Sequence, residues 1–269
     1  MSSPTGLGYV PNVVALGYRA GKLTTALCWT RGVISFPLAW AFTLVYCTAF
    51  LLFTLLTMRL LSRALMAPAV HWWARISLGL CGVRVVLDNP STLLDRRSRV
   101  VIINHPSTLD IMWGALIAPP ASVYVGKREL MFVPGINIAW WALRFALLDR
   151  HNPRRAHETL SRLVKQMQKE RLSVVMLPEG TRSQDGELQP FKKGAFHLAL
   201  QAGVPIYPIV AAGAYALMPR HRLVPFPGTI RVRFLAPIET HQWTRATLVD
   251  DIDAVRTKMQ LALREMEPD

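Results

Sequence analysis

RVVIINHPSTLD, residues 99–110, is the stretch from which the architecture of this chain can be predicted. Its first half is a run of consecutive apolar, largely β-branched residues, which is typical of a strand buried on both faces of a parallel sheet. Its second half turns polar and contains Pro106, a residue suited to the first position of a helix. The stretch therefore predicts a strand over residues 99–104, followed by a helix that begins at Pro106.

Apolar runs of the same kind recur downstream of residue 83 and alternate with segments of helical periodicity. The clearest helix spans residues 153–171, where Pro153 occupies the first turn and apolar residues share one face opposite lysines and arginines. A second helix is expected over about residues 245–265. Strands are expected at residues 83–87, 99–104, 122–125, 172–177, 204–210 and 229–234. This alternation predicts an α/β domain with a mostly parallel central sheet flanked by helices.

The N-terminal region differs in composition from the rest of the chain. No charged residue occurs between Gly32 and Met58. The 21 residues of Leu38–Met58 reach about 30 Å as a helix, which is the thickness of the hydrocarbon core of a bilayer. We therefore expect residues 1–80 to form an apolar, helical, membrane-anchoring region and residues 81–269 to form the α/β domain.

Two ways of meeting the membrane stay open. Basic residues flank the apolar run on both sides, so the positive-inside rule does not orient it. The next apolar piece, Ala64–Ala74, is short and contains Pro68, which favours a helical hairpin that enters one leaflet. A single spanning helix is the alternative.

The chain carries a net charge of +14, and seven lysines or arginines precede its first acidic residue, Asp88. Cations interleaved with apolar runs suit an anionic membrane surface, where each cation contributes about 1 kcal/mol. No nucleic-acid partner is expected, because the cations do not gather in a hydrophilic stripe. The three cysteines lie among apolar residues and form no CxxC pair. That pattern favours reduced thiols and a catalytic domain that faces the cytoplasm.

His105 and Asp110 are the candidate catalytic pair. His105 falls in the turn between strand and helix, and a carboxylate about one turn into the helix can fold back against the imidazole. The carboxylate then fixes the tautomer and stabilises the imidazolium, while the far nitrogen accepts a proton. Such a general base has no nucleophile of its own, so the substrate supplies one, most simply an alcohol. The alternative is a histidine that caps the helix beside an unrelated aspartate.

A second polar string, LPEGTRS at residues 177–183, also follows an apolar strand. Gly180 lets the backbone approach a ligand closely, Arg182 offers a planar fork for phosphate, and Thr181 adds a hydroxyl donor. These residue types predict a phosphate cradle; a polar turn with a solvated arginine is the alternative. Open α/β sheets bind ligands at the ends of their strands, where both strings are placed.

The motifs that the sequence lacks exclude several other chemistries. It has no G-x-S-x-G nucleophile elbow, no H-E-x-x-H zinc motif, no P-loop and no G-x-G-x-x-G after a strand. No metal or nucleotide cofactor is therefore expected.

Taken together, these strings resemble the glycerolipid acyltransferase family typified by 1-acylglycerol-3-phosphate acyltransferases. Four ordered blocks carry the resemblance: N-H-x4-D at residues 104–110, G-K-R-E-L at 126–130 with its close at 149–150, E-G-T-R within 177–183, and V-P-I-Y-P-I at 204–209. Leu177 and the leucines at 147–148 stand where the family often has aromatic or β-branched residues, a departure that affects packing more than chemistry.

The resemblance implies a membrane-bound O-acyltransferase that moves an acyl group from a thioester to the sn-2 hydroxyl of lysophosphatidic acid, giving phosphatidic acid. His105 is then the base that deprotonates the hydroxyl, and Asp110 orients it. The residues implied to bind the acceptor's phosphate are Glu179, Gly180, Thr181 and Arg182, with Lys127 and Arg150 adding positive charge. Backbone N–H groups near Ser107 are our own candidates for stabilising the oxyanion.

The partners implied are the lipid bilayer, a lysophospholipid acceptor, and acyl-CoA or acyl carrier protein as the donor co-substrate. A lysophospholipid leaves the bilayer at a cost of about 0.8 kcal/mol per CH₂, so its enzyme must work at the membrane surface. Within the family, another lysophospholipid or a lyso-aminolipid is the alternative acceptor. Outside it, the alternatives are a non-catalytic lipid-binding module and a thioesterase in which water replaces the alcohol.

Overall fold

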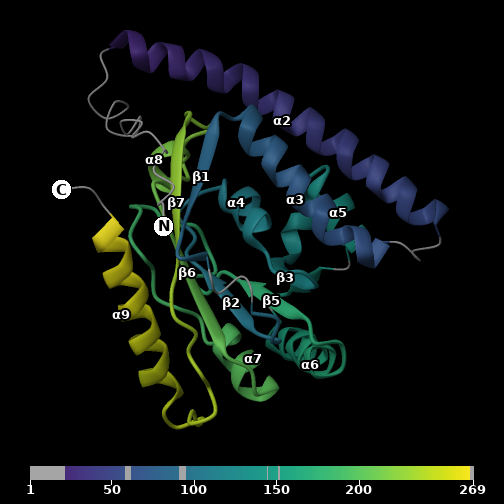
Figure 1. The fold of residues 1–269 in the computed structure, drawn as a ribbon, viewed down its shortest axis with the longest axis vertical. Coiled ribbons are helices and arrows are strands. Elements are labelled where there is room, and N and C mark those ends of the chain that lie inside the picture. Colours follow the sequence, from purple (N-terminus) through teal and green to yellow (C-terminus); the bar gives the residue numbers. More distant parts are fainter. Residues whose placement is uncertain (1–21, 58–61, 91–94, 144, 151, 267–269) are drawn as a thin grey trace, which may run out of the picture.

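The computed structural model describes residues 22–57, 62–90, 95–143, 145–150 and 152–266. Within these residues, seven strands form one sheet in the order β1-β7-β6-β2-β5-β3-β4. The strands are β1 (Val83–Asp88), β2 (Val100–Ile103), β3 (Ser122–Lys127), β4 (Ala146–Leu148), β5 (Ser173–Met176), β6 (Ile206–Ala212) and β7 (Gly228–Phe234). Neighbouring strands run parallel except β6 and β7, which are antiparallel. The predicted α/β fold with a mostly parallel sheet is confirmed (Figure 1).

Helices cover both faces of the sheet. Their bounds are α2 (Lys22–Leu56), α3 (Ser62–Leu80), α4 (Asp110–Ile117), η2 (Arg128–Phe132, a 3₁₀ helix), α5 (Ile136–Leu143), α6 (Pro153–Glu170), α7 (Gly194–Ala202), α8 (Ala214–Leu217) and α9 (Leu248–Met266). Helices α3 and α4 pack on one face, α6, α7 and α9 pack on the other, and α2 lies outside α3 (Figure 1).

Strand β2 shows why the apolar run at its centre is continuous. Val101 and Ile103 belong to the core shared with α3 and α4, whereas Val100 and Ile102 belong to the core shared with α6, α7 and α9. Successive side chains of a strand point to opposite faces, so a strand covered on both sides needs an apolar residue at every position. The position of β2 at the centre of the sheet follows from this pattern.

The six predicted strands are all confirmed, and β4 is an additional strand that the sequence pattern did not indicate. It has three residues and contains no β-branched side chain. Helix α6 confirms the predicted helix at 153–171: the Asn152 side chain accepts a hydrogen bond from the Arg155 N–H at 3.1 Å, and Arg171 ends the helix with φ of 51°. Helix α9 begins at Leu248, slightly later than expected.

The prediction that a helix begins at Pro106 is wrong, because α4 begins at Asp110. The preceding turn is held by contacts with distant parts of the chain. The Ser107 hydroxyl donates to the carbonyl of Met218 at 2.8 Å, and the Ser107 N–H donates to the Asp110 carboxylate at 2.8 Å. Bonding of this kind keeps residues 105–109 irregular and delays the helix by about one turn.

Helices α2 and α3 form an antiparallel pair (Figure 1). The Tyr46 hydroxyl donates to the carbonyl of Ala69 at 2.9 Å, and the Trp73 indole N–H donates to the Thr43 hydroxyl at 3.1 Å. Within α2, residues Thr25–Leu56 are long and apolar enough to cross a membrane. Residues 1–21 and 58–61 of the predicted anchoring region lie outside the described residues.

The two sides of α2 differ in residue size. The side that faces the rest of the protein carries small residues, all buried: Gly32, Ser35, Ala39, Thr43 and Cys47. The opposite side carries exposed aliphatic residues at helical spacing: Leu27, Ile34, Leu38, Val45 and Leu52. Small residues let α2 lie close against the domain, and a continuous apolar stripe is left pointing outward.

Candidate active site

Four segments that carry predicted site residues end at the same edge of the sheet. His105 lies two residues after β2, Glu179 three residues after β5, Lys127 ends β3, and Arg150 lies two residues after β4. These four strands are parallel neighbours, so their carboxyl ends meet at one edge. In open α/β sheets that edge is where ligands bind.

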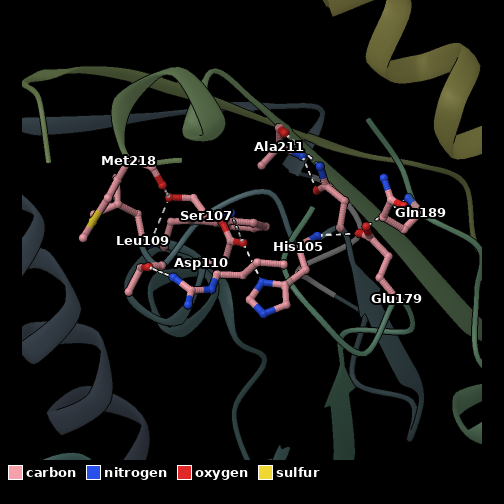
Figure 2. Close-up of polar contacts among 12 residues, drawn as sticks. His105, Ser107, Leu109, Asp110, Glu179, Gln189, Ala211 and Met218 are labelled. Carbon is pink, nitrogen blue, oxygen red and sulfur yellow. Dashed lines mark hydrogen bonds and ion pairs between the residues drawn. The ribbon is translucent and has the colours of Figure 1, made fainter. Parts of the chain in front are cut away.

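The predicted pair of His105 and Asp110 is in contact. The imidazole Nδ1 lies 2.8 Å from Asp110 Oδ2, and Figure 2 shows the two side chains facing each other. The Asp110 side chain is fully buried, while a fifth of the His105 side chain is exposed. A carboxylate on Nδ1 holds the proton on that nitrogen, so Nε2 is the atom that can accept a proton from a substrate.

Asp110 is held by two further donors. Its Oδ2 also accepts from the Ser107 N–H at 2.8 Å, and its Oδ1 accepts from the Trp113 indole N–H at 2.7 Å. Trp113 lies one turn further along α4, is completely buried and packs in the core beneath the site. These bonds fix the carboxylate in position.

The loop after β5 clamps the backbone of His105. The Glu179 carboxylate accepts from the His105 N–H at 2.6 Å, and the His105 carbonyl accepts from the Ser183 N–H at 2.9 Å. The second oxygen of Glu179 accepts from the Gln189 N–H at 3.0 Å (Figure 2). Burial raises the pKa of Glu179 above its ordinary value. Both oxygens of Glu179 therefore accept from backbone donors, and its part in binding phosphate stays a prediction.

Arg182 contacts the turn between His105 and α4. Its guanidinium Nη1 donates to the Thr108 hydroxyl, three residues after His105. Arg182 is half-buried, and a guanidinium carries five N–H donors. The Arg182 cation is thus held by Thr108, three residues after the candidate base His105, as the prediction of a phosphate cradle requires.

Arg150 contacts the backbone of Gly180 in the loop after β5. Gly180 has φ of +77°, a conformation that favours glycine, and the Arg150 guanidinium donates to its carbonyl. An added Cβ at Gly180 would lie 3.4 Å from Lys192 Cγ and 3.6 Å from Arg150 Nη1. Burial lowers the pKa of Arg150. The structure thereby adds Lys192 to the cations near the loop, and it leaves Lys127 and Thr181 exposed at the same edge.

The oxyanion hypothesis requires one correction. The N–H of Ser107 donates to Asp110 at 2.8 Å, so this group is engaged within the protein and is not a donor for an oxyanion. The Ser107 hydroxyl is engaged as well, since it donates to Met218 and accepts from the Leu109 N–H at 3.2 Å.

Two apolar cavities lie between the N-terminal helices and α4. The smaller, of about 30 Å³, is lined by Phe36, Trp40, Thr43, Trp73, Thr108, Ile111, Met112 and Ile136. Thr108 connects it with Arg182, because the Thr108 hydroxyl accepts a hydrogen bond from the Arg182 guanidinium. The larger, of about 270 Å³, lies further along the seam between α3 and α4 and is lined by residues that include Val70, His71, Ala115 and Tyr124. The seam offers apolar space on the same side of the sheet as the dyad.

Several residues that shape the site were given no structural role from the sequence, although Asn104 and Ser183 lie within the motifs quoted above. Asn104 forms a bidentate pair with the backbone of Ala211, at 3.0 and 2.8 Å, which fixes the turn at the end of β2 against β6. Trp113, Ser183 and Gln189 hold Asp110, His105 and Glu179 respectively. Of Trp113 and Gln189, which lie outside those motifs, only Trp113 carried a usable signal, since it lies three residues after Asp110 on the predicted helix and therefore on the same face.

Comparison with known proteins places these features among acyltransferases. The sequence profile of the family described as Acyltransferase matches residues 84–212. The 1-acyl-sn-glycerol-3-phosphate acyltransferase of Salmonella typhimurium is 32% identical over 197 residues, which cover 73% of this chain and 79% of that protein. The mouse 1-acyl-sn-glycerol-3-phosphate acyltransferase alpha is 33% identical over 191 residues, which cover 71% of this chain and 67% of that protein.

A solved structure shares the fold. The chain superposes on the 1-acyl-sn-glycerophosphate (LPA) acyltransferase PlsC from Thermotoga maritima with a TM-score of 0.76 and 20% identity, covering 91% of this chain and 99% of that chain. The likeness extends beyond the α/β domain, since coverage of this order takes in part of the N-terminal helices as well.

Proposed function

The chain belongs to the acyltransferase family, and from that premise we propose that it transfers an acyl group from a thioester to the sn-2 hydroxyl of lysophosphatidic acid, giving phosphatidic acid. The observation that carries the proposal is the contact of 2.8 Å between His105 Nδ1 and Asp110 Oδ2 at the ligand-binding edge of the sheet. The family establishes acyl transfer, and the local geometry supports both the mechanism and the acceptor.

In the proposed mechanism His105 acts as a general base. Its Nε2 takes the proton of the sn-2 hydroxyl as the hydroxyl oxygen forms a bond to the thioester carbonyl carbon. The tetrahedral intermediate collapses with breakage of the carbon–sulfur bond, and the departing thiolate takes the proton from the imidazolium. Asp110 stabilises the imidazolium between these two steps, and general-base assistance of this kind contributes about 10²–10⁴ in rate.

The cations around the loop after β5 support a phosphomonoester acceptor. Arg182 lies beside Thr108, and Arg150 lies against Gly180, so two guanidinium groups border the space next to the imidazole. Arginine suits a dianionic phosphate because its planar fork can donate two parallel hydrogen bonds. We assign Arg182 the direct phosphate contact, with Arg150, Lys127 and the Thr181 hydroxyl in supporting positions.

The outward stripe of α2 supports attachment to the membrane. It presents aliphatic side chains along one side of a helix whose other side packs on the domain, and each such side chain contributes about 1.5–3 kcal/mol when it leaves water. A helix bound to the domain along its length favours the hairpin that lies in one leaflet over a single spanning helix. The cavities at the α3–α4 seam then lie beneath the membrane-facing helices, where an acyl chain can enter from the lipid.

The test of the proposal is product formation with a panel of acceptors. Membranes carrying the protein receive one labelled acyl-CoA together with lysophosphatidic acid, lysophosphatidylcholine or a lyso-aminolipid. We expect labelled phosphatidic acid to form at least tenfold faster than the other products, because only lysophosphatidic acid offers a terminal phosphate to Arg182. Equal use of an acceptor without a phosphomonoester would contradict the proposed role of the cradle.

A further inference from the structure

We propose that the exposed face of α6 is the docking surface for an acidic acyl carrier protein that delivers the thioester donor. This inference rests on the acyl transfer proposed above and names the molecule that supplies the acyl group. Three features of α6 lead to this surface: its charge, its position beside the cradle, and its distance from the membrane-facing stripe.

The charge of α6 is concentrated on one side. Residues 153–171 contain six lysines or arginines and two glutamates. Arg155, Arg162, Lys165 and Lys169 follow one another at intervals of three, four or seven residues and are all exposed, so they form one stripe, whereas Leu163 and Met167 point into the core. Glu158, which lies within the stripe, pairs with Arg154 at 3.2 Å. The helix is about 27 Å long, so the stripe offers a cationic surface of macromolecular size.

The stripe begins near Arg150 and the phosphate cradle. Helix α6 starts three residues after Arg150, whose guanidinium contacts Gly180 of the phosphate cradle. Asp149, next to Arg150, lies 3.8 Å from the Arg155 guanidinium in the first part of the stripe. A partner seated along α6 would therefore reach the dyad with a short flexible arm extended past the N-terminal end of the helix.

Two further cations precede α7. Lys192 and Lys193 are exposed and immediately precede α7, and Lys192 also borders Gly180. Gly194, the first residue of α7, lies against Leu160 of α6. These two lysines add positive charge beside the cradle.

The position of α6 favours a protein partner over the bilayer. Helix α2 and its apolar stripe lie at one end of the molecule, and α6 lies toward the other end, beyond the sheet (Figure 1). A bilayer that covers the stripe of α2 leaves the outer side of α6 in water. A small nucleotide would meet only one end of a stripe of this length, whereas an acidic helical carrier protein can pair with all of it.

The experiment tests two acyl donors on the wild type and on two variants. Each variant replaces two cations by glutamate, so both change the net charge equally. R162E/K165E reverses two cations of the stripe, and K258E/R264E reverses two exposed cations of α9, which covers the same face of the sheet at a distance from α6 (Figure 1). None of the four residues belongs to the proposed catalytic or phosphate-binding groups. The measured quantity is kcat/KM for palmitoyl-acyl carrier protein and for palmitoyl-CoA, with lysophosphatidic acid as acceptor and with low and high salt.

We expect R162E/K165E to lower kcat/KM for the carrier-protein donor about tenfold at low salt and to leave the CoA donor within about twofold. High salt should reduce the difference in kcat/KM between R162E/K165E and the wild type with the carrier-protein donor, because these charges are exposed. K258E/R264E should stay within about twofold of the wild type with both donors.

Three results would overturn the docking surface while leaving the proposed function intact. The first is a wild type that uses palmitoyl-CoA but not the carrier-protein donor. The second is an equal loss of kcat/KM with both donors in R162E/K165E, and the third is a loss with the carrier-protein donor in K258E/R264E as large as that in R162E/K165E. Weaker binding of R162E/K165E to vesicles of phosphatidylglycerol and phosphatidylcholine would assign the stripe to the membrane and also overturn the proposal. Absence of acyl transfer with both donors in the wild type would reject the proposed function together with the surface.

Discussion

Asp110→Asn removes one negative charge from the centre of the candidate active site without changing the size of the side chain. In the wild type, Oδ2 accepts from His105 Nδ1 and from the Ser107 N–H, both at 2.8 Å, and Oδ1 accepts from the Trp113 indole at 2.7 Å. An amide has one acceptor oxygen. If that oxygen faces Ser107 and His105, the amide NH₂ meets the Trp113 N–H; if it faces Trp113, the NH₂ meets Ser107 and forces the proton of His105 onto Nε2.

The magnitude follows from these two orientations. One buried donor loses its partner in either case, which costs about 1–3 kcal/mol in the free energy of unfolding. The imidazolium loses its counter-charge, and in the second orientation Nε2 already carries a proton and cannot act as the base. We expect the rate of acyl transfer to fall about 10³–10⁴-fold, which corresponds to about 4–5.5 kcal/mol of activation free energy.

The assay measures phosphatidic acid formation at saturating lysophosphatidic acid and acyl-CoA, with thermal unfolding of the same samples. Trp113→Phe is the matched control, because it removes the donor to Oδ1 and leaves the carboxylate on His105. The control should lose a comparable amount of stability but keep activity within about tenfold of the wild type. The reasoning would be refuted if Asp110→Asn kept more than a tenth of the wild-type rate, or if the two variants lost equal activity.

Four further outcomes are expected. Arg182→Lys should raise KM for lysophosphatidic acid about tenfold and leave KM for the acyl donor unchanged, since an ammonium cannot reproduce a bidentate phosphate contact; equal changes in both values would argue against a phosphate role. Glu179→Gln should lower the melting temperature and the rate together, because one of two backbone N–H groups loses its acceptor; a stable, fully active variant would show that the clamp on His105 is unnecessary. V45E/L52E should weaken binding to lipid vesicles at least tenfold, as measured by sedimentation, and wild-type binding would exclude the stripe of α2 as the membrane contact. Burial raises the pKa of the Cys81 thiol to about 11, so this residue should escape labelling by a thiol reagent at neutral pH until the protein is unfolded; labelling of the native protein would contradict its buried position.

Elements whose own residues determine their structure could be predicted from the sequence. Strand β2 is apolar at every position because both of its faces are covered, and α6 carries its capping residue Asn152, its Pro153 and its apolar face within one segment. Strand β4 could not be predicted in this way, because its three residues pair with β3 and have little strand preference of their own.

The irregular turn before α4 also could not be predicted from its own residues. Pro106 is locally suited to start a helix, but Ser107 is bonded to Met218 and Asn104 to Ala211, more than a hundred residues away in the chain. Local propensity was therefore overridden by tertiary contacts that no local pattern shows.

Some residues of the candidate site could likewise be predicted from the sequence, and others could not. His105, Asp110 and Arg182 could be identified because their residue types suit the chemistry and their positions follow apolar strands. Glu179 has a suitable residue type in the same string, yet its carboxylate is turned inward to backbone N–H groups. Residue type indicated a polar role for Glu179, but the direction of its side chain depends on how two loops from different strands meet.

The most direct test of the account is the rate at which purified His105→Ala, reconstituted in phospholipid vesicles, converts labelled acyl-CoA and lysophosphatidic acid to phosphatidic acid. Removal of the imidazole leaves the phosphate cradle and the outward stripe of α2 in place, so the variant should bind vesicles as the wild type does and form product at least about 10³-fold more slowly. A folded, vesicle-bound variant that forms phosphatidic acid at the wild-type rate would show that the imidazole at the end of β2 is not the base.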